Sequence, residues 1–266
     1  MHRLIDGHLD LAYNALGYDR DQTCALETIR RREAKLTAPT VQETRGHGDS
    51  SEEHWGTATV TLPEMRRAGI AICLATVLQR VKRDYVRMRP PPLYELDHAS
   101  QQIAHAAAQG QLAYYRVLEQ AGELEMIRDA RTLQTVWDKH REGAQGDPLP
   151  AIGYILSIEG CDPIVSPAQA QWWWQQGLRT ACLAHYGQGV YGFGTGGDGP
   201  LTADGLELLR VFEQLGVILD LAHTAETGFY QALDQFHGPV FVSHGNCQAL
   251  TPGDRQLSDE QLRLVI

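Results

Sequence analysis

Residues 151–160 read AIGYILSIEG, and this short segment carries the pattern that decides the fold class. The segment is almost continuously apolar, is bounded by Pro150 and Gly160, and has a carboxylate near its end. Five further segments share the pattern, at 3–11 (RLIDGHLDL), 68–78 (AGIAICLATVL), 177–185 (GLRTACLAH), 216–223 (GVILDLAH) and 239–245 (PVFVSHG). Such runs are typical of strands that are covered on both faces, as in parallel α/β sheets. The sequence therefore predicts six buried strands.

Helical patterns fill the intervals between these strands. Apolar residues recur at a spacing near 3.6 in residues 95–121, 131–142, 167–176, 202–215 and 225–236. Thr202 can cap one of these helices, and Ser258 with Gln261 has the form of a capping box before a last short helix. Residues 19–60 are polar, and we expect an irregular excursion there. Alternating strands and helices predict one α/β domain over residues 1–266, with no linker.

The composition disfavours several classes of function. The chain has 266 residues, of which 43% are hydrophobic and 21% charged, so it is long enough for a large globular core. A formal charge of −10 without a long basic run disfavours nucleic acids and anionic membranes as partners. The N-terminal residues MHRLIDGH lack the pattern of a signal peptide. Five cysteines at wide spacing predict free, mostly buried thiols, and we expect a cytoplasmic protein.

Side chains that could bind metal stand near the ends of five of the six predicted strands. These residue types are uncommon in apolar runs, so their joint position indicates a function. In barrels and open α/β sheets alike, active sites form at the carboxyl ends of the strands. The residues concerned are His8, Asp10, Glu159, His185, His223 and His244.

His8 and Asp10 lie two residues apart on a strand, so their side chains point to the same face and form half of a metal shell. We expect one ion bound by His8, Asp10 and Glu159, and a second bound by Glu159, His223 and His244. Nitrogen and oxygen ligands without thiolate suit Zn²⁺, with Mn²⁺, Co²⁺ or Fe²⁺ as alternatives. Two ions bridged by a carboxylate and a water would yield a hydroxide at neutral pH.

Other conspicuous residues receive simpler interpretations. The glycine-rich segment 187–199 contains a G-x-G-x-x-G match, but it continues as a loop, so we expect no dinucleotide site. Of Trp172, Trp173 and Trp174 we expect one in the core and one at an interface, because three adjacent positions surround most of a helix. We expect the remaining histidines to be solvated, namely His2, His47, His54, His98, His105, His140 and His237.

Taken in order, these motifs resemble the membrane (renal) dipeptidase family, the M19 metallopeptidases. The matching segments are Asp6–Leu11 (DGHLDL), Ser157–Gly160 (SIEG), Gly177–His185, Asp220–His223 (DLAH) and Ser243–Asn246 (SHGN). The resemblance implies a TIM-type (β/α)₈ barrel of the metal-dependent hydrolase kind, in which a binuclear zinc centre hydrolyses dipeptides. It further implies that Glu159 bridges the ions, that His185 contacts the scissile carbonyl or the tetrahedral intermediate, and that Arg255 binds the substrate carboxylate.

The family pattern also includes a catalytic Asp after the seventh strand. Only about six βα units are visible in this sequence, and we expect strands seven and eight of the barrel to be missing. The leading hypothesis is a zinc-dependent dipeptidase that cleaves free dipeptides with a metal-bridging hydroxide. Its alternatives are a related binuclear amidohydrolase acting on acylated amino acids or lactones, and a truncated metal-binding barrel without activity. A small dipeptide is the expected partner, and a homodimer stays open.

Overall fold

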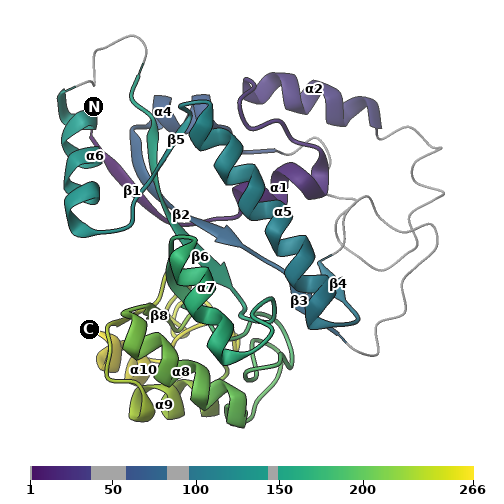
Figure 1. Ribbon diagram of the computed structural model, residues 1–266, viewed down its shortest axis with the longest axis vertical. Coiled ribbons are helices and arrows are strands. Elements are labelled where there is room, and N and C mark those ends of the chain that lie inside the picture. Colours follow the sequence, from purple (N-terminus) through teal and green to yellow (C-terminus); the bar gives the residue numbers. More distant parts are fainter. Residues whose placement is uncertain (1, 37–57, 83–95, 143–148) are drawn as a thin grey trace.

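The computed structural model describes residues 2–36, 58–82, 96–142 and 149–266 of the chain. Its main sheet is curled and all-parallel, and six strands follow one another across it in chain order, β1-β2-β6-β7-β8-β9 (Figure 1). This order of parallel neighbours is that of a (β/α)₈ barrel, here as an open part with six of the strands, which agrees with the expected fold class. The strands are β1 (Leu4–Leu9), β2 (Ile70–Val77), β6 (Ile152–Glu159), β7 (Leu178–Cys182), β8 (Ile218–Asp220) and β9 (Val240–Phe241).

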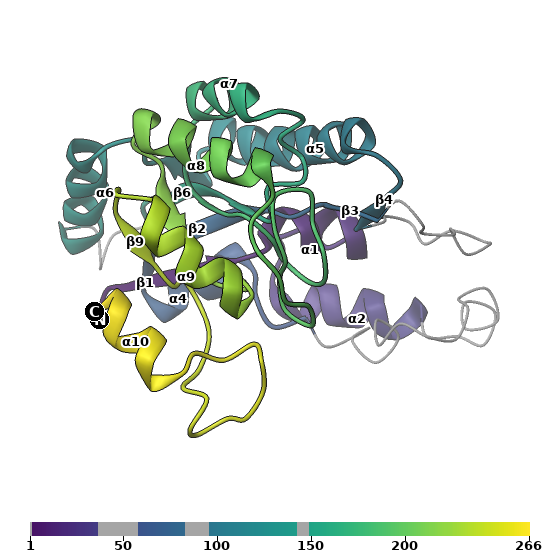
Figure 2. The same ribbon diagram turned by 90° about the horizontal axis from the view of Figure 1, so that it is seen from below.

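Helices cover the sheet, and Figure 2 shows α5, α7 and α8 along one side of it. The helices include α1 (Leu11–Tyr18), α2 (Leu26–Leu36), α4 (Leu62–Ala68), α5 (Gln101–Gln120), α6 (Ala130–Glu142), α7 (Ala170–Gln175), α8 (Ala203–Leu215), α9 (Glu226–Gln235) and α10 (Asp259–Val265). The Thr202 side chain accepts a hydrogen bond from the Gly205 amide and starts α8, and Ser258 with Gln261 forms the expected capping box.

The core lies between the sheet and these helices. Along α8 the buried residues Leu208, Leu209 and Phe212 recur at helical spacing and form the apolar stripe that faces the sheet. Trp173 of α7 is fully buried, whereas Trp172 and Trp174 are only partly buried against the core. Burial of each such large side chain contributes on the order of 2 kcal/mol, so this packing fixes the strands whose ends carry the site.

The expectation that every strand is covered on both faces is wrong for β1, and the two residues of β9 are also only partly buried. Leu4 and Ile5 are 48% and 55% exposed. The strand pairs with β2 on one side and lies at the end of the strand order described above, so fewer elements cover it.

The sequence predicts an irregular excursion over residues 19–60. This prediction is wrong for the part that forms α2, and residues 37–57 of the segment lie outside the described part of the chain. Two residues explain why a polar segment is helical here. Ile29 is buried, and Glu33, one turn later on the same face, is buried in an ion pair with Arg20. The tertiary contact with Arg20 compensates for the short apolar stripe.

Several elements have no counterpart in the sequence prediction. Strands β3 (Arg80–Val81) and β4 (Asp97–His98) form a separate parallel pair beyond the end of β2. The helix expected from residue 95 therefore begins only at Gln101, after the cap residue Ser100. Strand β5 (Leu124–Met126) pairs with the start of β6, and α1 and α4 were also not predicted.

Three histidines expected at the surface are half-buried instead. His98 contacts Gln79, His105 contacts the carbonyl of Pro163 at 3.0 Å, and His140 contacts the carbonyl of Ala151 at 2.8 Å. His105 also packs edge-on against Trp172 and Trp173, which supply an apolar environment that the helical sequence pattern did not reveal. His2 and His237 are exposed as expected, whereas His47 and His54 lie outside the described residues.

The five cysteines agree with the expectation of free, mostly buried thiols. All five cysteines are free, with Cys73, Cys161 and Cys182 buried and Cys24 and Cys247 half-buried. Within the described ranges, no helix combines the length and the apolar character that a membrane crossing needs.

Candidate metal centre

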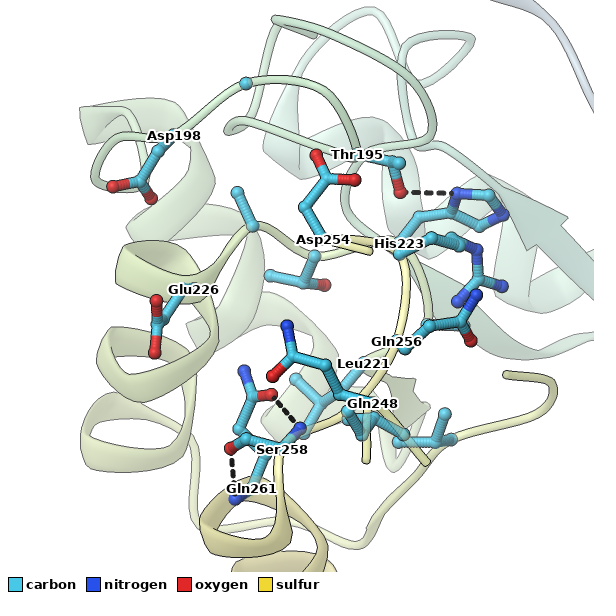
Figure 3. A pocket seen from close by; sticks show the side chains of 17 residues that line it. Thr195, Asp198, Leu221, His223, Glu226, Gln248, Asp254, Gln256, Ser258 and Gln261 are labelled. Carbon is cyan, nitrogen blue, oxygen red and sulfur yellow. Dashed lines mark hydrogen bonds between the residues drawn. The ribbon is translucent and has the colours of Figure 1, made fainter. Parts of the chain in front are cut away.

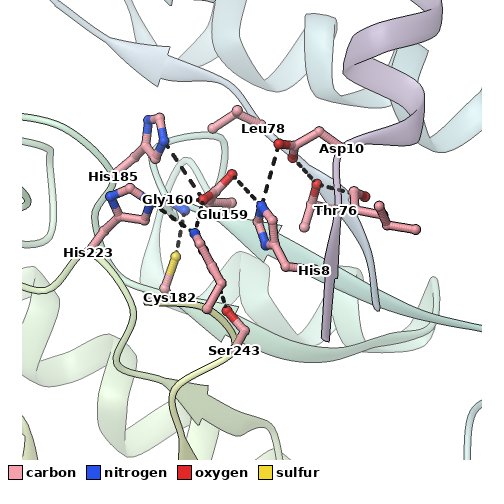
Figure 4. A network of polar contacts seen from close by, with 12 residues as sticks. His8, Asp10, Thr76, Leu78, Glu159, Gly160, Cys182, His185, His223 and Ser243 are labelled. Atoms are coloured by element: carbon pink, nitrogen blue, oxygen red, sulfur yellow. Dashed lines mark hydrogen bonds and ion pairs between the residues drawn. The ribbon is translucent and has the colours of Figure 1, made fainter. Parts of the chain in front are cut away.

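The residues predicted at the strand ends come together in one cluster, which Figure 4 shows in close-up. His8 lies within β1, Asp10 follows that strand directly, and Glu159 is the last residue of β6. The other three histidines, His185, His223 and His244, each stand three residues beyond the end of their strand, so loops rather than strands carry them. In a parallel sheet the carboxyl ends share one edge, which is why residues 236 positions apart in sequence meet.

Glu159 is the centre of the cluster. Its Oε1 lies 3.1 Å from Nε2 of His223 and 3.3 Å from Nε2 of His244, and its Oε2 lies 3.5 Å from Nε2 of His8. Nε2 of His185 is slightly more distant, at 3.7 Å from Oε1. Asp10 stands on the far side of His8, with 3.4 Å between its Oδ2 and the same Nε2. Four imidazoles and two carboxylates thus converge.

The electrostatics of the cluster depend on its burial. The Glu159 side chain is only 4% exposed, and this burial raises its pKa. The hydrogen bonds with His223 and His244, together with the charges of His185 and His8, lower the pKa by more, so it lies well below the usual range. Burial lowers the pKa of His8, whereas the hydrogen bond with Asp10 and the charge of Glu159 raise it to a net value of about 8. Burial lowers the pKa of His185 to about 3, so this imidazole is neutral.

The outer ring nitrogens of three histidines have their own partners. Nδ1 of His223 lies 3.0 Å from the hydroxyl of Thr195, and Nδ1 of His244 lies 2.7 Å from the hydroxyl of Ser243. Asp220 joins the segments that carry His223 and His244, since its Oδ1 accepts hydrogen bonds from the amides of Ala222 and Ser243 at 3.0 Å. Nδ1 of the third, His185, lies 3.5 Å from Nη1 of Arg80.

The donor set fits a metal ion. Oε2 of Glu159 is buried without a hydrogen-bond partner, and a bound cation would satisfy it. Two groups of potential ligand atoms share Glu159: it stands with His8 and His244 in one group, and with His185 and His223 in the other. This grouping differs in part from the expected ligand sets, because it places His244 with His8, includes His185 and leaves out Asp10. His244 is also close to the second group, since its Nε2 lies 3.2 Å from Nε2 of His223. The nitrogen and oxygen donors are those that suit zinc and its neighbours.

Arg255 lies beside the cluster, in the loop after β9. Its Nη2 donates to the carbonyl of His244 at 3.1 Å. Its Nη1 packs against Gly245, and a Cβ added to that glycine would come within 3.3 Å of this nitrogen. Gly245 has φ = 152°, so this position favours glycine both for its backbone and for the space it leaves. Arg255 and His223 also line a cavity of about 230 Å³ that opens between the loops after β7, β8 and β9 (Figure 3).

Sequence reasoning found the inner residues but missed their supporting partners. Ser243 directly precedes His244, so its proximity was available from the sequence. Thr195 and Arg80 lie 28 and 105 residues from the histidines that they contact, and neither stands in a recognisable motif.

Comparisons with known proteins agree with the geometry. The model of the family described as membrane dipeptidase (peptidase family M19) matches residues 1–266. The dipeptidase verJ of Clonostachys rogersoniana is 28% identical over 51% of this chain and 34% of its own length. The chain spans about a third to a half of the length of the curated relatives that lead this comparison.

Solved structures show the same fold. The M19 metallopeptidase described as dipeptidase AC has a TM-score of 0.69 at 22% identity, covering 99% of this chain and 69% of its own. A Rhodobacter sphaeroides metallopeptidase, solved with a phosphinate mimic of the dipeptide L-Ala-D-Ala, has a TM-score of 0.67 at 22% identity, covering 99% of this chain and 70% of its own. With the family match over the whole sequence and the cluster at the strand ends, this chain belongs to the membrane dipeptidase family, peptidase family M19.

Proposed function

We propose that this chain carries the catalytic centre of a zinc-dependent dipeptidase that hydrolyses the peptide bond of free dipeptides. The observation that supports this most is the convergence of four imidazoles and two carboxylates around the buried, incompletely bonded Glu159. The Rhodobacter sphaeroides relative by fold binds a mimic of a dipeptide, which supports the same class of substrate here.

Two zinc ions are proposed, and five residues would bind them. His8 and Asp10 would serve one ion, His223 and His244 the other, and Glu159 both, because its two oxygens face different histidines. When bound, zinc supplies a Lewis acid and a water of lowered pKa. The hydroxyls of Thr195 and Ser243 can accept the Nδ1 hydrogens of their histidines, which leaves each Nε2 lone pair free for metal.

Two further residues would act on the substrate. The guanidinium of Arg255 is placed to bind the free carboxylate of a dipeptide, since its planar donor groups match a carboxylate bidentately. His185, neutral and at the rim of the cluster, would donate a hydrogen bond to the carbonyl oxygen as negative charge develops there. Arg255 favours a dipeptide over a lactone, because a lactone offers no carboxylate to it.

Metal content and hydrolysis, measured together, test the proposal. The zinc-loaded chain is expected to bind about two ions per molecule by elemental analysis and to release amino acids from Ala-Ala dipeptides. Glu159→Gln should lose both properties. His237→Ala is the matched control, because this exposed histidine lies outside the cluster. Metal binding without hydrolysis of any dipeptide would favour the metal-binding barrel without activity, and preferential hydrolysis of an acylated amino acid or a lactone would favour the amidohydrolase.

A further inference from the structure

We propose that Arg80 is a positioning residue that fixes the tautomer of His185, so that Nε2 of His185 carries the ring hydrogen and points it into the metal centre. The inference rests on the proposed function for its catalytic consequence, but the tautomer itself is a property of the folded chain. This tautomer distinguishes His185 from His223 and His244, whose Nδ1 atoms contact hydroxyl groups.

Different chemical groups contact Nδ1 of His223, His244 and His185, and the chemistry of each group indicates where the ring hydrogen lies. A hydroxyl, such as that of Thr195 or Ser243, can accept or donate, so it is compatible with a hydrogen on Nδ1. A guanidinium has five N–H donors and no acceptor. The contact of 3.5 Å between Nη1 of Arg80 and Nδ1 of His185 therefore favours a bare Nδ1. A neutral imidazole with a bare Nδ1 has its hydrogen on Nε2.

An ion pair with Asp97, made by its other donor groups, orients Arg80 towards His185. Its Nε and Nη2 donate to the two carboxylate oxygens of Asp97 at 2.6 and 2.8 Å, which is the bidentate geometry of a strong pair. Both side chains are largely buried, with 16% and 14% exposed. This ion pair uses one edge of the guanidinium and leaves Nη1 directed at the imidazole of His185. The separate β3–β4 pair thus supports the site, since it brings Asp97 alongside Arg80.

Buried hydrogen bonds fix the two partners relative to each other. Asp162, which is 4% exposed, accepts from the amide of Val81 at 2.7 Å and from the amide of Val190 at 2.8 Å. Val81 follows Arg80, and Val190 lies in the same loop after β7 as His185, so one carboxylate joins both segments. The carbonyl of His185 also accepts from the Thr195 amide at 2.9 Å.

The tautomer decides what His185 can do in the centre. Its Nε2 lies 3.7 Å from Glu159, near enough for His185 to count among the candidate ligands. A ligand nitrogen must offer a lone pair, whereas a protonated Nε2 offers only a hydrogen. Arg80 therefore excludes His185 from the metal shell and reserves it as a hydrogen-bond donor for a carbonyl oxygen. The Thr195 and Ser243 contacts leave His223 and His244 free to bind metal.

Nitrogen-15 NMR of the histidine rings tests the tautomer directly, because two-bond proton–nitrogen correlations distinguish Nδ1–H from Nε2–H. In the zinc-loaded chain, His185 is expected as the Nε2–H form, assigned through loss of its signals in His185→Gln. Arg80→Met, which keeps an unbranched side chain but removes every donor, is expected to convert His185 to the Nδ1–H form or to a mixture. Arg80→Lys keeps a donor and should retain part of the Nε2–H population.

Lys82→Met is the matched control. Lys82 also carries a positive charge near Asp97, with 3.7 Å between Nζ and Oδ2, and its side chain is 46% exposed. Removing it should leave the His185 signals unchanged, which separates the direct contact from a general charge effect. Because Arg80→Met leaves Asp97 unpaired, the double variant Arg80→Met/Asp97→Asn provides a second form that avoids an uncompensated carboxylate.

The outcomes separate this inference from the proposed function. An Nδ1–H tautomer in the unaltered chain, or an Nε2–H tautomer that survives in both Arg80→Met forms, overturns the role of Arg80 whether or not the chain hydrolyses dipeptides. Loss of zinc from His185→Gln would also overturn it, because His185 would then be a ligand. If dipeptides are cleaved, Arg80→Met is expected to lower kcat by roughly tenfold to a hundredfold with little change in KM, the usual range for a partner that orients a site residue.

Discussion

The buried carboxyl of Asp162 should make the free energy of unfolding depend on pH, and the size of this effect follows from the structure. Its carboxylate is 4% exposed and accepts two backbone hydrogen bonds, from Val81 and Val190. Burial raises its pKa from 3.8 to about 6, more than these amides and the charge of Arg80 lower it. The folded protein therefore retains the Asp162 proton at pH values where the unfolded chain has released it.

The sign of the pH effect follows from this difference. The contribution of Asp162 to the free energy of unfolding is complete below the unfolded pKa of 3.8 and is lost as the pH rises through about 6. A gap of about two pKa units corresponds to about 3 kcal/mol. In Asp162→Asn this titration is absent, because an amide does not ionise in this range.

The assay compares the two proteins by urea unfolding, followed by tryptophan fluorescence, from about pH 3.5 to about pH 7.5 across the range in which the carboxyl titrates. At acid pH the unaltered chain should be the more stable. A protonated carboxyl keeps two oxygens that can accept from the amides of Val81 and Val190, whereas the side chain introduced by Asp162→Asn has a single acceptor oxygen.

The free energy of unfolding of the unaltered chain, measured relative to that of Asp162→Asn, should then fall by about 3 kcal/mol from the acid end of this range to the neutral end. Every other titrating group is common to both proteins, so its contribution cancels in the comparison.

Two results would refute this reasoning. A difference that stays constant across the range would mean that Asp162 has the same pKa in the folded and unfolded chain. A difference that widens as the pH rises would mean that the two amides and Arg80 stabilise the carboxylate more than burial destabilises it.

Three further predictions concern the metal, the substrate and the core. Glu159→Gln should lower the bound zinc more than His223→Ala does in a metal titration, because Glu159 faces both groups of potential ligands; equal losses would contradict a bridging role. Arg255→Lys should lower kcat/KM for free dipeptides by roughly 30-fold to several thousand-fold and leave dipeptide amides nearly unaffected, and an equal fall for both would make Arg255 structural. Trp173→Ala should lower the free energy of unfolding by about 3–5 kcal/mol in urea titrations, whereas Trp174→Ala, at a partly buried position, should cost clearly less.

The sequence determined the main strands and most of the covering helices. Apolar runs such as 151–160 became β6, and the helical pattern of 202–215 became α8 with Thr202 as its cap. These predictions succeed because continuous apolar runs and 3.6-residue periodicity are local properties that burial in a parallel sheet enforces. The inner residues of the site followed from the same pattern, since histidine and carboxylate side chains at strand ends are conspicuous in sequence.

Tertiary contacts decided what the local pattern did not contain. Helix α2 depends on the ion pair of Glu33 with Arg20, and the β3–β4 pair depends on segments 17 residues apart that meet beyond the end of β2. Neither contact leaves a periodic signal in the sequence.

The difference between His185 and the other histidines of the cluster is the clearest case. The local sequence patterns of His185, His223 and His244 are alike, because each follows an apolar run, and the family resemblance is what implied a contact with the substrate for His185. In the folded chain, two of them face hydroxyls at Nδ1 and the third faces the guanidinium of Arg80. Residue type and strand order are properties of the sequence, so it could place these imidazoles at one edge of the sheet. The partners of the outer nitrogens of His185 and His223 come from segments distant in the chain, so only the tertiary structure decided them.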